Sequence, residues 1–338
     1  MNRNSVFIIA EAGVNHNGDM DLARRLIEVA AKAGADAVKF QTFRAKEIVT
    51  TLAQKANYQK ETSGAKESQF AMLKKLELDT RAHENLIAHA QKNNIEFLST
   101  PFDAESLDML LELGIATIKI PSGEITNLPY LRRVGNKGVP IVMSTGMTTL
   151  EEVKAAVTVL METGASAKDI TLLHCNTQYP TPLEDANLKA MDTLALTFPE
   201  CAIGYSDHTP GIACPIAATA MGASLIEKHF TLDKTMEGPD HAASINPEEL
   251  TAMVSGIRDI EKALGDGTKQ PSVSEKENIN IARRFLVAAA PIMAGEPFTK
   301  ANVVAKRTGQ GGISPMRWDE IMQKSASRNF HTGEIIEL

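Results

Sequence analysis

Eight short apolar runs recur along the first 265 residues, and each is followed by a segment whose apolar side chains have helical spacing. The first run covers residues 6–10, and the helical segment after it begins near residue 21 and stops at Gly34. None of the runs alternates cleanly between apolar and polar residues, which is typical of parallel strands buried on both faces. The repeat predicts an α/β fold, a TIM (β/α)₈ barrel, which takes about 250 residues. A doubly wound sheet is the alternative, but no GxGxxG turn follows the first run.

The composition changes after residue 265, where the barrel repeat ends. Residues 266–282 are rich in glycine, serine, proline and charge, and we interpret them as a linker. Residues 283–338 contain short apolar runs separated by glycine turns, which predicts a small domain of mostly β structure. A core of this size is marginal alone, so we expect the domain to pack on its own barrel or on a second subunit. The predicted domains are therefore a barrel over 1–265 and a small domain over 283–338.

A long polar stretch interrupts the repeat at residues 43–75. Loops of this length in a compact domain are usually functional or mobile. We expect an insertion that covers the barrel mouth as a lid. A solvated excursion with short helices of its own is the alternative.

Charge and cysteine content exclude several classes of function. The net charge is −7 without a basic block, which argues against nucleic acid as the main partner. Three cysteines without a CxxC motif fit a reducing compartment. The first apolar run is too short for a signal peptide, and no stretch approaches the roughly 20 apolar residues of a membrane span. We expect a cytoplasmic protein that does not bind membranes.

Polar residues gather at the carboxyl ends of the predicted strands, where a TIM barrel has its active site. They combine histidines, carboxylates, lysines, hydroxyls and an amide: Glu11, Lys39, Gln41, Thr100, Lys119, Ser122, Ser144, Thr177, Tyr179, Ser206, His208, Glu227, Lys228 and His229. Lysines beside hydroxyl groups can hold a phosphate or a carboxylate through charge-assisted hydrogen bonds. Lys39 and Lys119 lie inside apolar runs, which favours this role over extension of the side chain to solvent.

Two histidines follow consecutive predicted strands. His208 comes after the run at 202–205, and His229 comes after the run at 225–226. Consecutive strand ends are neighbours in a barrel, so both imidazoles would meet at one mouth. Neutral imidazole is a good ligand for a divalent metal, and two histidines with open positions describe a catalytic site. The alternative is that each histidine is a strand-end residue bonded to the backbone.

Ordered motifs span nearly the whole chain. They are IAEAGVNHNGD, VKFQ, STPFD, IKIPSGEITN, MSTGM, LHCxxxYPTP, IGYSDHTPG, IEKHFTLD and GPDH, with AGEPFT in the C-terminal segment. In these motifs the chain resembles the sialic acid synthase family of nonulosonic acid synthases. The C-terminal segment resembles the antifreeze-like SAF domain of the same enzymes. The resemblance implies a barrel enzyme that condenses phosphoenolpyruvate with an N-acyl mannosamine-type sugar and releases phosphate.

The resemblance also implies roles for individual residues. His208 and His229 would hold a divalent metal, most often manganese, with magnesium or cobalt as alternatives. The catalytic residues would be Glu11, Glu227, His208 and His229, with Glu227 as the acid or base. The phosphoenolpyruvate site would consist of Lys39, Thr100, Lys119, Ser122, Ser144 and Ser206. Contacts to the sugar or the intermediate would come from Glu11, Gln41, Thr177, Tyr179 and Asp240. Arg307 would reach the partner's sugar site in a domain-swapped homodimer.

Two positions depart from the sialic acid synthase pattern. Members that act on N-acetylmannosamine usually have Asn two residues before Tyr179, where this chain has Thr177. The segments HCNTQYP, LDKTMEGPDHAAS and GGISPMRWDEI look more like the branch that makes N,N'-diacetyllegionaminate from a 6-deoxy sugar with a second acetamido group. Thr308 replaces the usual proline after Arg307. The resemblance therefore favours the legionaminate branch, with N-acetylneuraminate as the alternative product.

Two other classes of function stay open at the level of sequence. One is a Schiff-base aldolase that uses Lys39, Lys119 or Lys228 as the nucleophile. The other is a noncatalytic sugar- or ice-binding protein, which only the C-terminal segment suggests. The set of polar strand ends favours the metal-dependent synthase.

Overall fold

The computed structural model describes residues 5–50, 53–55 and 68–338. Contacts divide the chain into two units, Met1–Gly265 and Asp266–Leu338. Each unit has its own hydrophobic core.

The first unit is built on one parallel sheet of eight strands. The strands are β1 (Phe7–Gly13), β2 (Ala37–Thr42), β3 (Glu96–Pro101), β4 (Ile118–Ile120), β5 (Ile141–Ser144), β6 (Ile170–Cys175), β7 (Ala202–Asp207) and β8 (Leu225–His229). Their order is β3-β2-β1-β8-β7-β6-β5-β4, and all of the ladders are parallel. The two end strands, β3 and β4, lie against each other, so the sheet curves into a nearly closed barrel. The predicted TIM barrel is confirmed.

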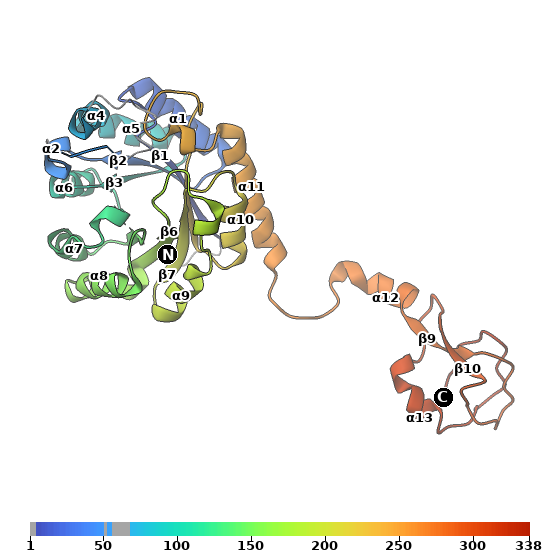
Figure 1. The fold of residues 1–338 in the computed structure, drawn as a ribbon. Helices are drawn as coiled ribbons and strands as arrows, with labels where there is room; N and C mark the ends of the chain where they lie inside the picture. Colours follow the sequence, from blue (N-terminus) through green and yellow to red (C-terminus); the bar gives the residue numbers. More distant parts are fainter. Residues whose placement is uncertain (1–4, 51–52, 56–67) are drawn as a thin grey trace. The chain divides into compact units, whose positions relative to one another are not determined.

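Helices surround this sheet in the first unit (Figure 1). They are α1 (Met20–Ala33), α5 (Thr80–Lys92), α6 (Ala104–Glu112), α7 (Leu128–Gly135), α8 (Leu150–Glu162), α9 (Ala190–Thr197), α10 (Ala213–Ala220) and α11 (Pro247–Leu264). Their ends follow sequence signals. The side chain of Asp19 caps the start of α1, and Gly34 ends that helix with a φ of +83°. Thr149 and Glu152 form the capping box of α8.

The core of the barrel unit lies between the sheet and the helices. Alternate strand residues such as Ile8 and Ile226 are fully buried there with helix residues such as Leu26 and Ile257. Leu172 belongs to a second buried cluster that packs α7 and α8 on β4–β6. The barrel interior at the carboxyl ends of the strands instead holds charged and hydroxyl side chains, and this difference positions the candidate site.

The predicted insertion at 43–75 contains two helices among its described residues. They are α2 (Ala45–Ile48) and α4 (Gln69–Leu76). Both helices contribute to a small apolar cluster, whose buried members are Val14, Phe43, Met72 and Leu76. The insertion is therefore partly ordered helix. The remainder of the predicted lid, 51–52 and 56–67, lies outside the described residues.

The second unit contains a helix where the sequence predicts only a linker. Helix α12 (Lys276–Ala282) follows a short 3-10 turn, and Ser272 and Glu275 form a capping box there. The antiparallel strands β9 (Arg284–Ala288) and β10 (Val303–Arg307) and the helix α13 (Trp318–Ile321) follow. The composition signal of the linker comes mostly from the glycine- and proline-containing residues 265–274, which precede the helix. Within the described residues, no helix combines the length and the apolar character needed to cross a bilayer.

Candidate active site

A cavity of about 200 Å³ opens at the carboxyl ends of the barrel strands. Predicted site residues from all eight strands, or from the turns that follow them, line it: Glu11, Lys39, Gln41, Thr100, Lys119, Ser122, Ser144, Thr177, Tyr179, Ser206, His208, Glu227 and His229. Strand register explains part of this gathering. Glu11 is paired with Lys39 across β1–β2 and with His229 across β1–β8, while Ser206 is paired with Glu227 across β7–β8.

Two lysines and two carboxylates form a buried charge cluster in this cavity. Nζ of Lys39 lies 2.6 Å from Oε2 of Glu11 and 3.6 Å from Oε2 of Glu227. Nζ of Lys119 lies 3.6 Å from Oε1 of Glu227. Glu227 is thus the shared counter-ion of both lysines, and all four residues are no more than 6% exposed.

Hydroxyl groups complete the surroundings of the charged groups. Lys39 donates a hydrogen bond to Oγ1 of Thr100 at 2.7 Å, and Lys119 donates to Oγ of Ser144 at 2.6 Å. Ser206 donates to Oε1 of Glu227 at 2.9 Å. Two ammonium groups with adjacent hydroxyls are suited to bind an anion with several oxygens, such as a phosphate or a carboxylate.

The two carboxylates have opposite pKa shifts. Burial raises the pKa of Glu11 to about 7, although Lys39 opposes the increase. Burial also acts to raise the pKa of Glu227, but Lys119 and Lys39 outweigh it and lower this pKa to about 2. Glu227 is therefore ionised at neutral pH, while Glu11 can hold or release a proton there. Carboxylates whose pKa values are driven apart are typical of acid–base sites.

The two lysines also differ in their pKa shifts. Burial acts to lower the pKa of Lys39, but Glu11 and Glu227 raise it above its ordinary value. Burial lowers the pKa of Lys119, and Glu227 compensates only in part. Lys39 is therefore held as an ammonium ion. Lys119 would gain the most from a bound anion, because its charge is the less fully compensated of the two.

His208 and His229 meet at this mouth, as their positions predict. Their ring centroids are 5.4 Å apart, and the ring of Tyr179 lies 4.1 Å from that of His208. Burial lowers the pKa of His208 to about 4 and that of His229 well below its ordinary value, so both imidazoles are neutral. Nδ1 of His208 donates to the carbonyl of Asn176, which leaves the Nε2 lone pair free.

The histidine pair fits a divalent metal. Nδ1 of His229 is buried without a hydrogen-bond partner among the described residues. Metal–nitrogen bonds of about 2.0–2.1 Å allow two imidazoles at this ring separation to share one ion. Over the described ranges, no group of three or more His, Cys, Asp and Glu side chains is placed to bind a metal. The described protein would therefore supply two ligands and leave the other positions to water and substrate.

Lys228 is the strand-end residue that does not reach the cavity. Its Nζ lies 2.5 Å from Oδ2 of Asp207 and donates to the carbonyl of Thr209 at 2.7 Å. Asp207 also accepts from the hydroxyl of Tyr205 at 3.0 Å. Lys228 lies between two cavity residues, Glu227 and His229, so the alternation of side chains along a strand places it on the opposite face. The expectation that Lys228 belongs to the catalytic mouth is wrong.

Several cavity residues were not predicted from the sequence: Phe102, Pro121, Gly123, Met147 and Cys175. Most of them are apolar or small, so they carry no chemical signal, but each lies within three residues of a strand end. Gly146 allows close packing here, because a Cβ atom at this position would lie 2.7 Å from Cγ2 of Thr177 and 2.8 Å from Oγ of Ser122. Only their distance from a strand end, and not their residue type, could have identified these residues as part of the cavity lining.

Besides Lys228, two further predicted residues lie outside this cavity. Asp240 lines an adjoining cavity of about 330 Å³, which shares Gln41 and Tyr179 with the first. Burial raises the pKa of Asp240 to about 6. Arg307 ends β10 in the second unit, where it is exposed and lines a shallow pocket with Arg328.

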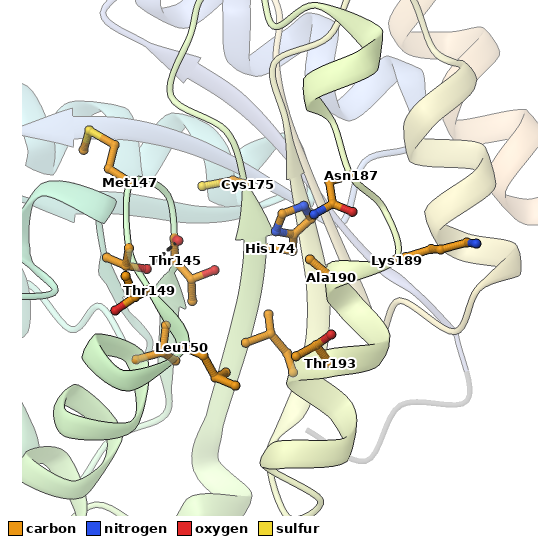
Figure 2. A pocket seen from close by; sticks show the side chains of 13 residues that line it. Thr145, Met147, Thr149, Leu150, His174, Cys175, Asn187, Lys189, Ala190 and Thr193 are labelled. Atoms are coloured by element: carbon orange, nitrogen blue, oxygen red, sulfur yellow. Dashed lines mark hydrogen bonds between the residues drawn. The ribbon is translucent and has the colours of Figure 1, made fainter.

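A larger cavity, of about 660 Å³, lies on the outer side of β5 and β6 (Figure 2). Figure 2 shows Thr145, His174, Asn187 and Thr193 around it, with Lys189 at its edge. Nε2 of His174 contacts the carbonyl of Ala186 at 2.8 Å. This cavity is lined mainly by hydroxyl, amide and aliphatic groups, whereas the cavity at the strand ends holds the convergent charges.

Fold and site together define a TIM-barrel protein with a polar cavity at its strand ends and a small C-terminal domain. The NeuB family matches residues 26–269, and the SAF domain matches residues 283–337. The chain belongs to the NeuB family. This confirms the resemblance drawn from its motifs.

Individual relatives agree over nearly full length. The chain is 55% identical to the N,N'-diacetyllegionaminic acid synthase of Campylobacter jejuni, covering 97% of this chain and 98% of that protein. It is 47% identical to the enzyme of the same name from Legionella pneumophila, covering 97% and 92%. The structure of an N-acetylneuraminic acid synthetase from Leptospira borgpetersenii is similar with a TM-score of 0.71 and 38% identity, covering 81% of this chain and 90% of that one.

Proposed function

We propose that this protein is an N,N'-diacetyllegionaminate synthase. It would condense phosphoenolpyruvate with 2,4-diacetamido-2,4,6-trideoxymannose and release phosphate. The two relatives that carry this name support the choice of product. The observation that carries the chemistry is the cavity in which Lys39, Lys119 and Glu227 lie beside a pair of neutral histidines. N-acetylneuraminate is the alternative product, because the similar Leptospira borgpetersenii protein is an N-acetylneuraminic acid synthetase.

The lysines would bind the phosphate and carboxylate groups of phosphoenolpyruvate. Lys39 is held as an ammonium ion, and Thr100 and Ser144 direct the two Nζ atoms toward the cavity. Ser122 and Ser206 line the same cavity and can donate to further anion oxygens. Fixed donors around a charged substrate lower the barrier by positioning and by electrostatic stabilisation.

The sugar would bind on the side of Gln41, Tyr179 and Asp240. His208 and His229 would hold a divalent ion, for which manganese is our first choice. When bound, this ion would polarise the carbonyl of the open-chain sugar. C3 of phosphoenolpyruvate would then form a bond to the sugar aldehyde carbon. Water would add at C2, and the C–O bond to phosphate would break.

Glu11 would exchange a proton during this sequence. Its pKa near 7 and its contact with Lys39 place a carboxyl group that can hold or release a proton within the cavity. Glu227 would stay ionised as the counter-ion of both lysines. This division differs from the role of acid or base that the resemblance implies for Glu227.

A Schiff-base aldolase is less well supported than the synthase. Lys228 is engaged with Asp207 away from the cavity, and the pKa of Lys39 is raised, which weakens an amine nucleophile. Lys119 lies in the cavity with a lowered pKa, but its Nζ is engaged with Glu227 and Ser144. Phosphoenolpyruvate labelled with ¹⁸O at the bridging C–O oxygen tests the mechanism. Release of labelled phosphate supports the proposed C–O cleavage. Unlabelled phosphate, or covalent trapping of the substrate on a lysine by borohydride, would contradict it.

Arg307 would complete the sugar site of a partner chain in a homodimer. It is exposed in its own unit and carries a permanent charge that suits a distant hydroxyl or carboxylate. Mixing inactive Arg307→Ala and His208→Ala chains tests this proposal. If the SAF domain acts on the partner, mixed dimers regain one intact site and part of the activity. No recovery from demonstrated mixed dimers would contradict it.

A further inference from the structure

The second cavity lies directly against the catalytic mouth. It has a volume of about 330 Å³ and shares Gln41, Phe102, Tyr179 and His229 with the mouth. The two cavities therefore share a wall, and one member of the histidine pair belongs to that wall. This second cavity is called the side chamber.

The walls of the side chamber are mainly apolar. The chain after β2 supplies most of them, with contributions from the ends of β1 and β3: Val14, Phe43, Ile48, Val49, Met72, Leu73, Leu76 and Phe102. The rings of Phe43 and Phe102 pack edge to face with centroids 6.2 Å apart. Ile48, Val49 and Leu73 are only half-buried, so apolar surface remains open to the chamber.

Polar groups lie only along part of this chamber. Gln41, Gln69, Glu124, Tyr179 and Asp240 supply amide, carboxyl and hydroxyl groups. They can bind the hydroxyl and amide groups of a sugar ring or chain. The apolar wall cannot bind hydroxyl groups favourably, because a hydroxyl placed against it loses its hydrogen bonds to water and gains no new partner.

We infer that the side chamber receives the methyl-bearing substituents of the sugar and selects a 6-deoxy, acetamido-substituted substrate. This inference rests on the proposed function and extends it to substrate choice. The proposed sugar carries a methyl group at C6 and one on each acetamido group, whereas N-acetylmannosamine has a hydroxyl at C6 and one acetyl methyl. Apolar pockets discriminate by about 10- to 200-fold per methylene and about 100-fold against an added hydroxyl. The chamber thus gives a physical reason for a preference that Thr177 alone does not explain.

Two sugars that differ only at C6 test this inference. They are 2,4-diacetamido-2,4,6-trideoxymannose and its 6-hydroxy counterpart, each assayed for kcat/KM at saturating phosphoenolpyruvate. The full-length enzyme should prefer the 6-deoxy sugar by at least about tenfold. Leu73→Gln should reduce that preference at least about fivefold, because it places an amide in the chamber wall. The KM for phosphoenolpyruvate should not change.

Two further variants make the result interpretable. Leu111→Gln changes a half-buried leucine of α6, outside the residues that line the chamber, and should keep the wild-type preference. Val49→Thr keeps the side-chain shape and replaces Leu73→Gln if that variant does not fold. If Leu73→Gln or Val49→Thr keeps the same preference for the 6-deoxy sugar as Leu111→Gln, the inference is overturned and the proposed function stands. Absence of turnover with either sugar would overturn both.

Discussion

Replacing Glu227 by glutamine tests the electrostatic design of the site. The variant keeps the shape of the side chain but removes the one negative charge that Lys39 and Lys119 share, each at 3.6 Å. With an effective dielectric constant near 20, each pair has an attraction of about 4–5 kcal/mol. The desolvation of the carboxylate, which the variant no longer bears, offsets part of this sum. Breaking a buried pair from one side typically costs about 3–5 kcal/mol, and we expect a loss in that range.

Lys119 should be the residue most affected in this variant. Lys39 retains Glu11 at 2.6 Å, whereas the hydrogen bond from Lys119 to Ser144 is to a neutral hydroxyl. A bound anion could replace the missing charge. Inorganic phosphate or phosphoenolpyruvate should therefore raise the melting temperature of Glu227→Gln more than that of the wild type.

The assays are thermal unfolding and urea unfolding, each with and without about 10 mM phosphate, so that a bound anion is measured as added stability of the folded state. Glu320→Gln is the matched control, because Glu320 forms ion pairs with Arg317 and Lys324 on the surface. Exposed pairs contribute little, so the control should behave as the wild type. A Glu227→Gln variant as stable as the control, with no added response to phosphate, would refute the shared counter-ion.

Three other predictions follow from the same geometry. His208→Ala should stay folded but lose the rise in melting temperature that manganese gives the wild type; an unchanged rise would exclude His208 as a ligand. Lys228→Met should lower the free energy of unfolding by about 3–5 kcal/mol, because it leaves Asp207 buried with no cation at 2.5 Å; an unchanged value would show that this ion pair contributes nothing to the barrel. The raised pKa of Glu11 stabilises the protein below pH 4.5, and this contribution is lost as the pH rises through about 7. The stability of the wild type relative to Glu11→Gln should therefore fall over that window, and a rise would contradict the direction of the shift.

Local pattern was sufficient to predict the barrel and most of its mouth. Helix α1 begins within a residue of its predicted start and ends at Gly34 as predicted, because capping residues and apolar spacing act over a few residues. Lys39 and Lys119 were identified because a charged residue inside an apolar strand is costly without a partner. The register of parallel strands then brings these separate strand ends together.

The orientation of Lys228 was missed although the sequence contains the signal for it. Its neighbours Glu227 and His229 face the cavity, so strand alternation places Lys228 on the opposite face. Other features depend on contacts that the sequence does not reveal. The opposite pKa shifts of Glu11 and Glu227 could not be predicted from the sequence, because they depend on which lysines lie beside each carboxylate. The side chamber likewise arises from segments far apart in the chain, such as Leu73 and Asp240.

The most direct test of the central claim is phosphate release from phosphoenolpyruvate with manganese and two alternative sugars. We predict rapid release with 2,4-diacetamido-2,4,6-trideoxymannose and much slower release with N-acetylmannosamine. The reverse preference would make this protein an N-acetylneuraminate synthase in which Thr177 tolerates the C6 hydroxyl. Absence of release with either sugar would contradict the proposed synthase activity.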